Sequence, residues 1–142
     1  MKQTRIEVPI GIKESTYYLS GFVYINVKLD MRNLVFLLDT GSSHTWLSEE
    51  RFKKDRYLQN IASVVPEKDR VVMFGVNGDV DQDQQFEILT DRFQVGKIDF
   101  TVHLMTVDFH LHDVDGILGL DFMLPNKAVI DLPNKKLILD VG

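Results

Sequence analysis

The chain has 142 residues, of which 44% are hydrophobic and 26% are charged, a length and composition typical of one globular domain, so we expect residues 1–142 to form a single domain. A net charge of −5 without a basic cluster argues against nucleic acid and anionic membranes as main partners. The absence of cysteine excludes disulfides, thiolate nucleophiles and thiolate metal sites.

The first part of the chain is predicted to form short antiparallel strands. Residues 1–7 contain no continuous apolar segment, so we expect no signal peptide or membrane anchor and a soluble, cytoplasmic protein. Whether the chain is an excised domain of a larger or anchored protein stays open. Residues 4–10 and 22–29 alternate apolar and polar side chains, as half-buried strands do. The apolar run 34–38 is rich in branched and aromatic residues, which predicts a buried strand.

The second part continues this pattern after one short helix. Ser48, followed by two acidic and then by basic residues, predicts a surface helix that reaches Leu58. Segments 70–76 and 85–89 flank Asn77-Gly78, a strong hairpin signal. Further strands are expected at 93–95 and 99–107, and a last hairpin joins 128–132 to 136–139. Many short strands with one or two short helices predict an all-β, barrel-like fold.

One carboxylate directly follows the buried run, in the sequence LLDTGS at residues 37–42. Asp39 is expected where the strand leaves the core, and a carboxylate there is costly unless it is hydrogen-bonded or used for chemistry. Thr40 supplies a hydroxyl, and Gly41 permits a close backbone approach with its amide free to donate. Asp-Thr-Gly is also a common turn sequence, so the triplet alone is a weak signal.

A second apolar element that ends in glycine, Ile117-Leu118-Gly119, follows 80 positions after Asp39 (119 minus 39). Together the two elements resemble the signatures of the retropepsin-like aspartic proteases, the family of the retroviral proteases and their bacterial relatives. The resemblance implies a closed β-barrel of the acid protease fold, with Asp39 as the catalytic residue. It also implies that Ile117, Leu118 and Gly119 pack beside the Asp39 loop and lead into a short helix.

The chain carries this motif once, so the resemblance implies a homodimer with one Asp39 from each copy on the two-fold axis. Two carboxylates that close cannot both ionise and would share one proton. The ionised one would activate a water molecule and the protonated one would donate to the peptide carbonyl oxygen, without metal or cofactor. By the same resemblance, Thr40 would hydrogen-bond across the axis, and the Gly41 amide can donate to Asp39.

Two regions are candidates for contact with an extended peptide substrate. Ser42 is a candidate for contact with substrate backbone. The expected hairpin at 72–78 falls where the family carries a flap, a lid that closes over a substrate bound as an added strand. An ordinary surface hairpin is the alternative. The flap residues predicted to bind substrate are Phe74, Gly75, Val76, Asn77 and Gly78.

Several features of the sequence allow functions other than proteolysis. A dimeric peptide-binding or scaffold module that keeps the barrel without turnover stays open, as does a monomeric β-barrel ligand binder. Residues 79–83 resemble a calcium loop but lack the required Gly and Glu farther along. His110 and His112 could begin a metal site, but no third ligand is identifiable. Trp46 and Phe52 are expected to be core residues.

Overall fold

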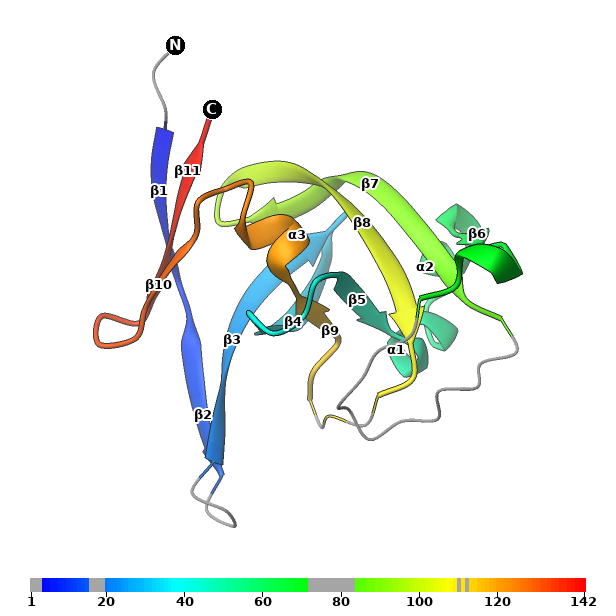
Figure 1. The fold of residues 1–142 in the computed structure, drawn as a ribbon, viewed down its shortest axis with the longest axis horizontal. Helices are drawn as coiled ribbons and strands as arrows, with labels where there is room; N and C mark the ends of the chain where they lie inside the picture. The colour runs from blue at the N-terminus through cyan, green and yellow to red at the C-terminus, as the bar shows by residue number, and fades with distance from the viewer. Residues whose placement is uncertain (1–3, 16–19, 72–83, 110, 112) are drawn as a thin grey trace.

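The computed structural model describes residues 4–15, 20–71, 84–109, 111 and 113–142, and its secondary structure is mostly β (Figure 1). The strands are β1 (Thr4–Pro9), β2 (Gly11–Ser15), β3 (Ser20–Leu29), β4 (Arg32–Leu38), β5 (Thr45–Ser48), β6 (Ser63–Val64), β7 (Phe86–Val95), β8 (Ile98–Val107), β9 (Gly116–Leu118), β10 (Val129–Asp131) and β11 (Lys136–Val141). The helices are α1 (Glu49–Lys53), α2 (Arg56–Ile61) and α3 (Leu120–Met123), with a 3-10 turn at Glu67–Asp69.

Six strands form a closed barrel in the order β3, β4, β9, β5, β8 and β7. The barrel closes where the end of β3 pairs with β7, with Lys28 opposite Gln94 and Leu29 opposite Phe93. Strands β2 and β6 extend this sheet beyond the closure. Closure leaves few free strand edges, and it confirms the predicted all-β barrel.

Strand β9 lies between β4 and β5, two strands that follow each other in sequence. It runs parallel to β4, with Leu38 opposite Leu118, and antiparallel to β5, with Trp46 opposite Ile117. The segment 39–44, which joins β4 to β5, therefore has to pass over the end of β9. This arrangement places the Asp-Thr-Gly segment next to the Ile117-Leu118-Gly119 element, as the resemblance to the retropepsin-like proteases implied.

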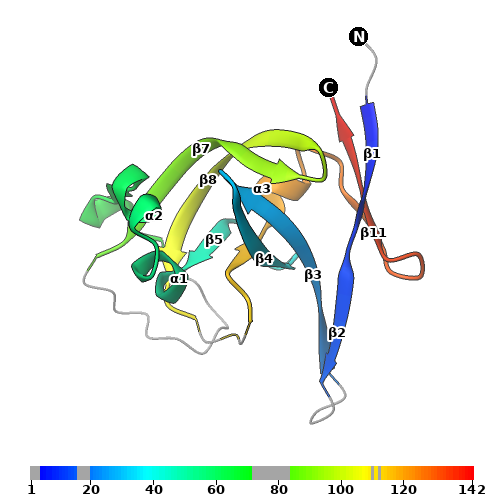
Figure 2. The same ribbon diagram turned by 180° about the vertical axis from the view of Figure 1, so that it is seen from behind.

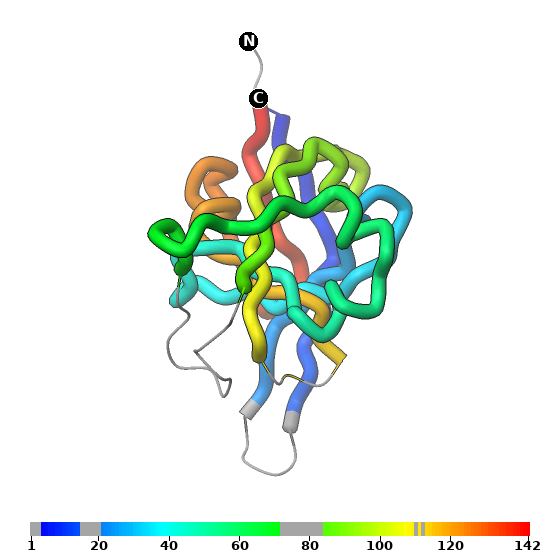
Figure 3. The backbone as a smooth tube through the Cα atoms, turned by 90° about the vertical axis from the view of Figure 1, so that its right-hand side faces the viewer, coloured from blue at the N-terminus to red at the C-terminus, as the bar shows by residue number. Residues whose placement is uncertain are grey.

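Both chain ends belong to a second, three-stranded sheet in the order β1, β11, β10, which we call the terminal sheet. Strand β1 pairs with β11 from Thr4 opposite Val141 to Pro9 opposite Lys136, so the two termini lie side by side (Figures 1 and 3). Helices α1 and α2 lie at the far end of the barrel from this sheet (Figures 1 and 2). The last predicted hairpin is thus confirmed as β10 and β11.

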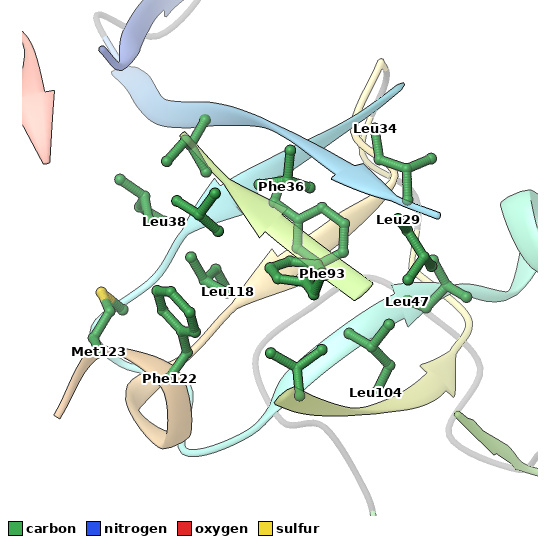
Figure 4. Close-up of a cluster of buried hydrophobic side chains, with 14 of the residues drawn as sticks. Leu29, Leu34, Phe36, Leu38, Leu47, Phe93, Leu104, Leu118, Phe122 and Met123 are labelled. Carbon is green, nitrogen blue, oxygen red and sulfur yellow. The ribbon is translucent and has the colours of Figure 1, made fainter. Parts of the chain in front are cut away.

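The barrel interior and the inner face of the terminal sheet share one hydrophobic core (Figure 4). Phe36 on β4 and Phe93 on β7 are fully buried and pack edge to face, with ring centroids 5.3 Å apart. Leu137 and Leu139 of β11 are also fully buried and belong to the same cluster. A smaller cluster forms around Trp46, and both Trp46 and Phe52 are buried as predicted.

Three details differ from the sequence-based expectations. The helix expected from Ser48 to Leu58 is two helices, and with α3 the described residues contain three short α-helices rather than one or two. The strand expected at 93–95 is the end of the long strand β7, whose pairing with β8 is interrupted between Thr90 and Phe93. Most of the hairpin expected around Asn77-Gly78 lies outside the described residues.

Candidate active site

Asp39 directly follows β4, and its backbone is held by β9. Its N–H donates to the carbonyl oxygen of Leu118 at 3.1 Å, which extends the pairing of Leu38 with Leu118 by one step. The Asp39 carbonyl oxygen accepts a hydrogen bond from the Ser42 N–H at 3.2 Å, which closes a turn over residues 39–42. Because both backbone groups of Asp39 are hydrogen-bonded, its side chain has a fixed position at the end of β4.

The Asp39 carboxylate is half-buried and accepts a hydrogen bond from the Gly41 N–H at 2.9 Å through Oδ1. A Cβ at Gly41 would lie 3.1 Å from this same oxygen, so a larger residue would crowd the bond. The contact predicted between the Gly41 amide and Asp39 is present.

Gly119 allows the Asp39 loop and the start of α3 to touch. A Cβ at this position would lie 2.1 Å from the carbonyl oxygen of His44 and 2.7 Å from that of Ser42. No side chain fits at such distances, because backbone atoms cannot move aside cheaply. The next residue, Leu120, donates its N–H to the Ser42 carbonyl oxygen at 2.8 Å, so α3 begins in direct contact with the Asp39 loop.

Hydrogen bonds between Thr45 and Asp121 stabilise the contact between the Asp39 loop and the start of α3. The sequence did not predict these bonds. The Thr45 hydroxyl donates to Asp121 Oδ1 at 2.6 Å, and the Thr45 N–H donates to Asp121 Oδ2 at 3.2 Å. The same hydroxyl accepts a hydrogen bond from the Gly119 N–H at 3.1 Å. Because Thr45 is only 1% exposed, its polar groups depend on these partners.

Ser42, predicted to contact substrate, uses its hydroxyl within the loop. Ser42 Oγ donates to the carbonyl oxygen of His44 at 2.8 Å and accepts a hydrogen bond from Trp46 Nε1 at 3.0 Å. A buried indole N–H needs a partner, and Ser42 supplies it. Trp46, which the sequence indicated only as a core residue, thus also holds the loop.

Gln85 holds the residue that precedes the segment 72–83. Its amide is 3% exposed; Oε1 accepts from the Val71 N–H, and Nε2 donates to the Val71 and Thr106 carbonyl oxygens, all at 3.0 Å. This side chain was not singled out from the sequence, because a lone glutamine before a strand carries no local pattern.

Of the remaining candidate residues, the structure describes Thr40 but not the flap residues or the two histidines. Thr40 is exposed at the tip of the turn. The flap candidates Phe74 to Gly78, the segment 79–83, His110 and His112 lie outside the described residues. Within the described part of the chain, no group of three or more histidines and acids is arranged to hold a metal ion. No helix in that part is long and apolar enough to cross a membrane.

Comparison with known proteins identifies the same region. A sequence model of a family described as aspartyl protease matches residues 25–122. No curated protein sequence gives a significant match. The family match covers more than half of the chain and includes the Asp39 loop, β9 and α3.

Three solved structures resemble the fold. A retropepsin-like aspartic protease from Rickettsia conorii superposes with a TM-score of 0.58 at 20% identity, covering 99% of this chain and 95% of that one. The retroviral protease-like domain of Ddi1 from Leishmania major gives 0.56 at 12% identity, covering 85% and 91%. The EIAV protease bound to an inhibitor gives 0.50 at 18% identity, covering 83% and 100%. Together with the family match, they show that this chain belongs to the aspartyl protease family and has a retropepsin-like fold.

Proposed function

We propose that the chain is an aspartic endopeptidase that hydrolyses peptide bonds with two Asp39 side chains, one from each subunit of a homodimer. The placement of Asp39 carries this proposal. The carboxylate lies at the end of a buried strand, and the Gly41 N–H donates a hydrogen bond to one of its oxygens, Oδ1. Among the described residues no donor contacts the other oxygen, Oδ2, so it is available for water or for a second carboxylate.

A second subunit is required because peptide hydrolysis needs both a base and an acid. One carboxylate cannot fill both roles at once, and among the described residues no second carboxyl group is hydrogen-bonded to Asp39. A two-fold axis next to Asp39 would bring the same side chain from a second copy. Thr40 supports this arrangement, because it is exposed beside Asp39 and has no hydrogen-bond partner among the described residues.

In the proposed reaction the two carboxylates share one proton, because two negative charges in contact are strongly disfavoured. The ionised Asp39 takes a proton from a water molecule, whose oxygen attacks the peptide carbonyl carbon. The protonated partner gives its proton to the carbonyl oxygen. When the tetrahedral intermediate collapses, the Asp39 that took the water proton gives it to the leaving nitrogen, the other Asp39 takes a hydroxyl proton from the intermediate, and the C–N bond breaks. The pair is then left with one proton, as at the start. No covalent intermediate with the enzyme is formed.

The proposed substrate is an extended peptide that binds across both Asp39 loops. Ser42, in the turn that follows Asp39, remains the proposed contact for its backbone, although its hydroxyl already has two partners within the loop. The segment from Phe74 to Gly78 remains the proposed flap. An extended substrate under such a lid would be recognised by main-chain hydrogen bonds and by alternating side-chain pockets.

The test is cleavage of a mixed peptide library from acidic to neutral pH by the parent protein and by Asp39→Asn. We expect Asp39→Asn to lose at least about 100-fold in kcat/KM, because proton transfer by a positioned side chain contributes at least that much. The exposed Asp91→Asn serves as a charge-matched control and should cleave like the parent. Mass spectrometry of the products gives the cleaved bonds.

Two outcomes would contradict the proposal. An Asp39→Asn variant that cleaves as fast as the parent would remove Asp39 from the chemistry. A parent protein that is folded and dimeric and binds peptides, but cuts none at any pH, would favour the rival scaffold module. Sedimentation equilibrium of each variant shows whether loss of cleavage reflects chemistry or loss of the dimer.

A further inference from the structure

Strand β3 has an open stretch of backbone where the barrel closes. It pairs with β2 from Ser20 to Tyr24 and with β7 at Lys28 and Leu29. Both partners lie on the side of β3 that is opposite to β4. Residues 25–27 lie between these two pairings and pair only with β4. The edge of β3 therefore has a gap between β2 and β7.

Asn26, at the centre of this gap, directs its backbone polar groups into it. Its partner on β4 is Val35. The Val35 N–H donates to Asp115 Oδ2, and the Val35 carbonyl oxygen accepts from the Asp115 N–H, both at 2.8 Å, so Val35 exchanges no hydrogen bonds with Asn26. Antiparallel strands alternate hydrogen-bonded and non-hydrogen-bonded pairs, so the Asn26 N–H and carbonyl oxygen point away from β4. In the described part of the chain neither group has a backbone partner, and such groups are a template for another strand.

A groove of about 530 Å³ lies at this gap. The buried side chains that line it are apolar, namely Val8, Ile10 and Val27. The turn between β7 and β8 borders the groove and rests on β1, since a Cβ at Gly96 would lie only 3.1 Å from Val8 Cγ2 (Figure 2). The groove thus combines an apolar surface with an open strand edge.

The groove is cationic, although the whole chain has a net charge of −5. Its lining includes Lys28 and Lys97 but no acidic residue. Both lysines are exposed, and neither forms an ion pair with any residue that the structure describes. Side-chain amides add hydrogen-bonding groups to the lining, and they belong to Asn26, Asn33 and Gln94. This chemistry is complementary to a ligand that carries carboxylates.

The nearest acidic residues leave these lysines available. Asp30 and Asp99 line an adjacent hollow that Lys28 also borders. The Asp30 carboxylate already accepts hydrogen bonds from Tyr57 and Arg92. Asp99 is exposed and forms no ion pair with Lys28. An incoming carboxylate can therefore pair with the two lysines of the groove without displacing an acid of this chain.

We infer that this groove binds an extended acidic segment of another protein, which adds to β3 as a short strand. One residue of the segment exchanges two backbone hydrogen bonds with Asn26, and its carboxylates pair with Lys28 and Lys97. A small anion does not satisfy this site, because it can accept from the Asn26 N–H but cannot donate to the Asn26 carbonyl oxygen. The inference goes beyond the proposed function and does not depend on cleavage.

The side-chain pattern of β3 predicts the sequence of the bound segment. Asn26 and Lys28 are exposed on the outer face, and Val27 between them is buried. A residue paired with Asn26 directs its side chain to this outer face, where Lys28 is its diagonal neighbour. The residues before and after it direct theirs inward, toward Val27 and Val8. The segment is therefore expected to alternate acidic and apolar residues.

Fluorescence anisotropy tests this inference with a labelled peptide of alternating glutamate and valine. We expect the full-length parent and Asp39→Asn to bind it equally, and a lysine-valine peptide to bind at least about tenfold more weakly. The double variant Lys28→Glu with Lys97→Glu should raise the Kd for the acidic peptide by at least about tenfold, because like charges then face each other. Lys54→Glu is the control, because it makes the same charge change on an exposed side chain that does not line the groove.

Two further comparisons test the backbone bonds. Asn26→Pro removes the N–H that faces the gap and breaks no bond to β4, so we expect it to fold and to bind more weakly. Asn26→Ala keeps this N–H and should bind nearly as the parent does. If Asn26→Pro does not fold by circular dichroism, N-methylation of the peptide decides. Methyl groups on the glutamate nitrogens should abolish binding, whereas methyl groups on the valine nitrogens, which face away from β3, should not.

The outcomes are separate from those of the proposed function. Parental binding by Asp39→Asn, together with loss in the double lysine variant, supports the groove even if no peptide is ever cleaved. A Kd above about 1 mM for the parent, or an unchanged Kd in the double lysine variant, overturns the inference. Loss of binding in Asp39→Asn alone would place the peptide at the Asp39 site and overturn it as well. Displacement of the peptide by an equal concentration of inorganic phosphate would show a small-anion site and exclude the added strand.

Discussion

At the scale of single residues, Asp121 helps to fix the geometry of the Asp39 loop. Its two carboxylate oxygens accept from the hydroxyl and the N–H of Thr45, and the Thr45 hydroxyl in turn accepts from Gly119. This chain of bonds joins the loop after Asp39 to the element that supports it. Asp121 itself need not touch substrate to affect the reaction.

We expect Asp121→Ala to destabilise the protein by about 1–3 kcal/mol, because it leaves the buried polar groups of Thr45 without acceptors. We also expect kcat to fall more than KM rises, because a misplaced Asp39 weakens the chemical step rather than peptide binding. Asp121→Asn, which keeps one acceptor oxygen, should lie between parent and Asp121→Ala. Urea denaturation and steady-state kinetics measure both effects.

The exposed Asp99→Ala on β8 is the control for this prediction and should match the parent in both assays. An Asp121→Ala variant with parental stability and kcat would show that the Thr45 contacts do not hold the loop.

The site residues that the sequence predicted are those whose chemistry is local. Asp39 and Gly41 share one turn, and Gly119 belongs to a short pattern of its own. Asp121 was missed because its partner Thr45 lies 76 positions away in the sequence. Gln85 was missed because a lone glutamine carries no local pattern, and its partners Val71 and Thr106 are 14 and 21 positions away. Such pairs are set by the barrel, and no periodicity in the sequence encodes them.

At the scale of elements, the junction of α1 and α2 shows why one helix was wrongly expected. Asp55 caps α2, accepting from the N–H groups of Tyr57 at 3.0 Å and Leu58 at 3.3 Å. Its other oxygen accepts from Arg32 Nε at 2.5 Å. In the sequence, acidic residues followed by basic ones suggested one helix that runs past Asp55. An aspartate is also a favourable first residue for a new helix, because its side chain can cap the free N–H groups there. The contact with Arg32, on β4, also holds Asp55 at this position, and the local sequence does not reveal it.

Two carboxylates near this junction, those of Asp55 and Asp30, make the stability of the fold depend on pH. Burial raises the pKa of Asp55, but the Arg32 guanidinium and the N–H groups of Leu58 and Tyr57 outweigh burial and hold the pKa below its ordinary value. Hydrogen bonds from Tyr57 and then Arg92 likewise lower the pKa of Asp30. Carboxylates with lowered pKa stabilise the fold above their unfolded pKa, and this contribution is lost as the pH falls through the folded value.

We therefore expect the urea midpoint to fall as the pH drops below about 4, the ordinary pKa of aspartate. Asp55→Asn, which can still cap α2 but carries no charge, should lower the midpoint at pH 6 and show a shallower fall in acid. Urea titrations from pH 3 to pH 6 measure this, with Asp91→Asn as the control. An Asp55→Asn variant with the same acid dependence as the parent would exclude Asp55 as a contributor.

At the scale of the whole molecule, the terminal sheet joins the two ends of the chain to one core. Val8 of β1 and Leu137 and Leu139 of β11 are buried in the same cluster as Phe36 and Phe93 of the barrel. The first and last strands therefore stabilise the barrel and each other. The sequence predicted the hairpin of β10 and β11 but not the pairing of β11 with β1. Two strands that lie far apart in the sequence carry no local pattern that identifies them as partners.

This shared core predicts that residues 1–142 unfold as one cooperative unit. Trp46 is the only tryptophan and is 2% exposed in the smaller cluster beside the Asp39 loop, so its fluorescence reports on the site. Far-UV circular dichroism reports on all strands. We expect the two signals to change at the same urea concentration, as in two-state unfolding. If the dimer forms, both midpoints should rise together with protein concentration, because association stabilises the folded state by mass action. A Trp46 transition that precedes loss of the strands would show that the site and the barrel unfold separately.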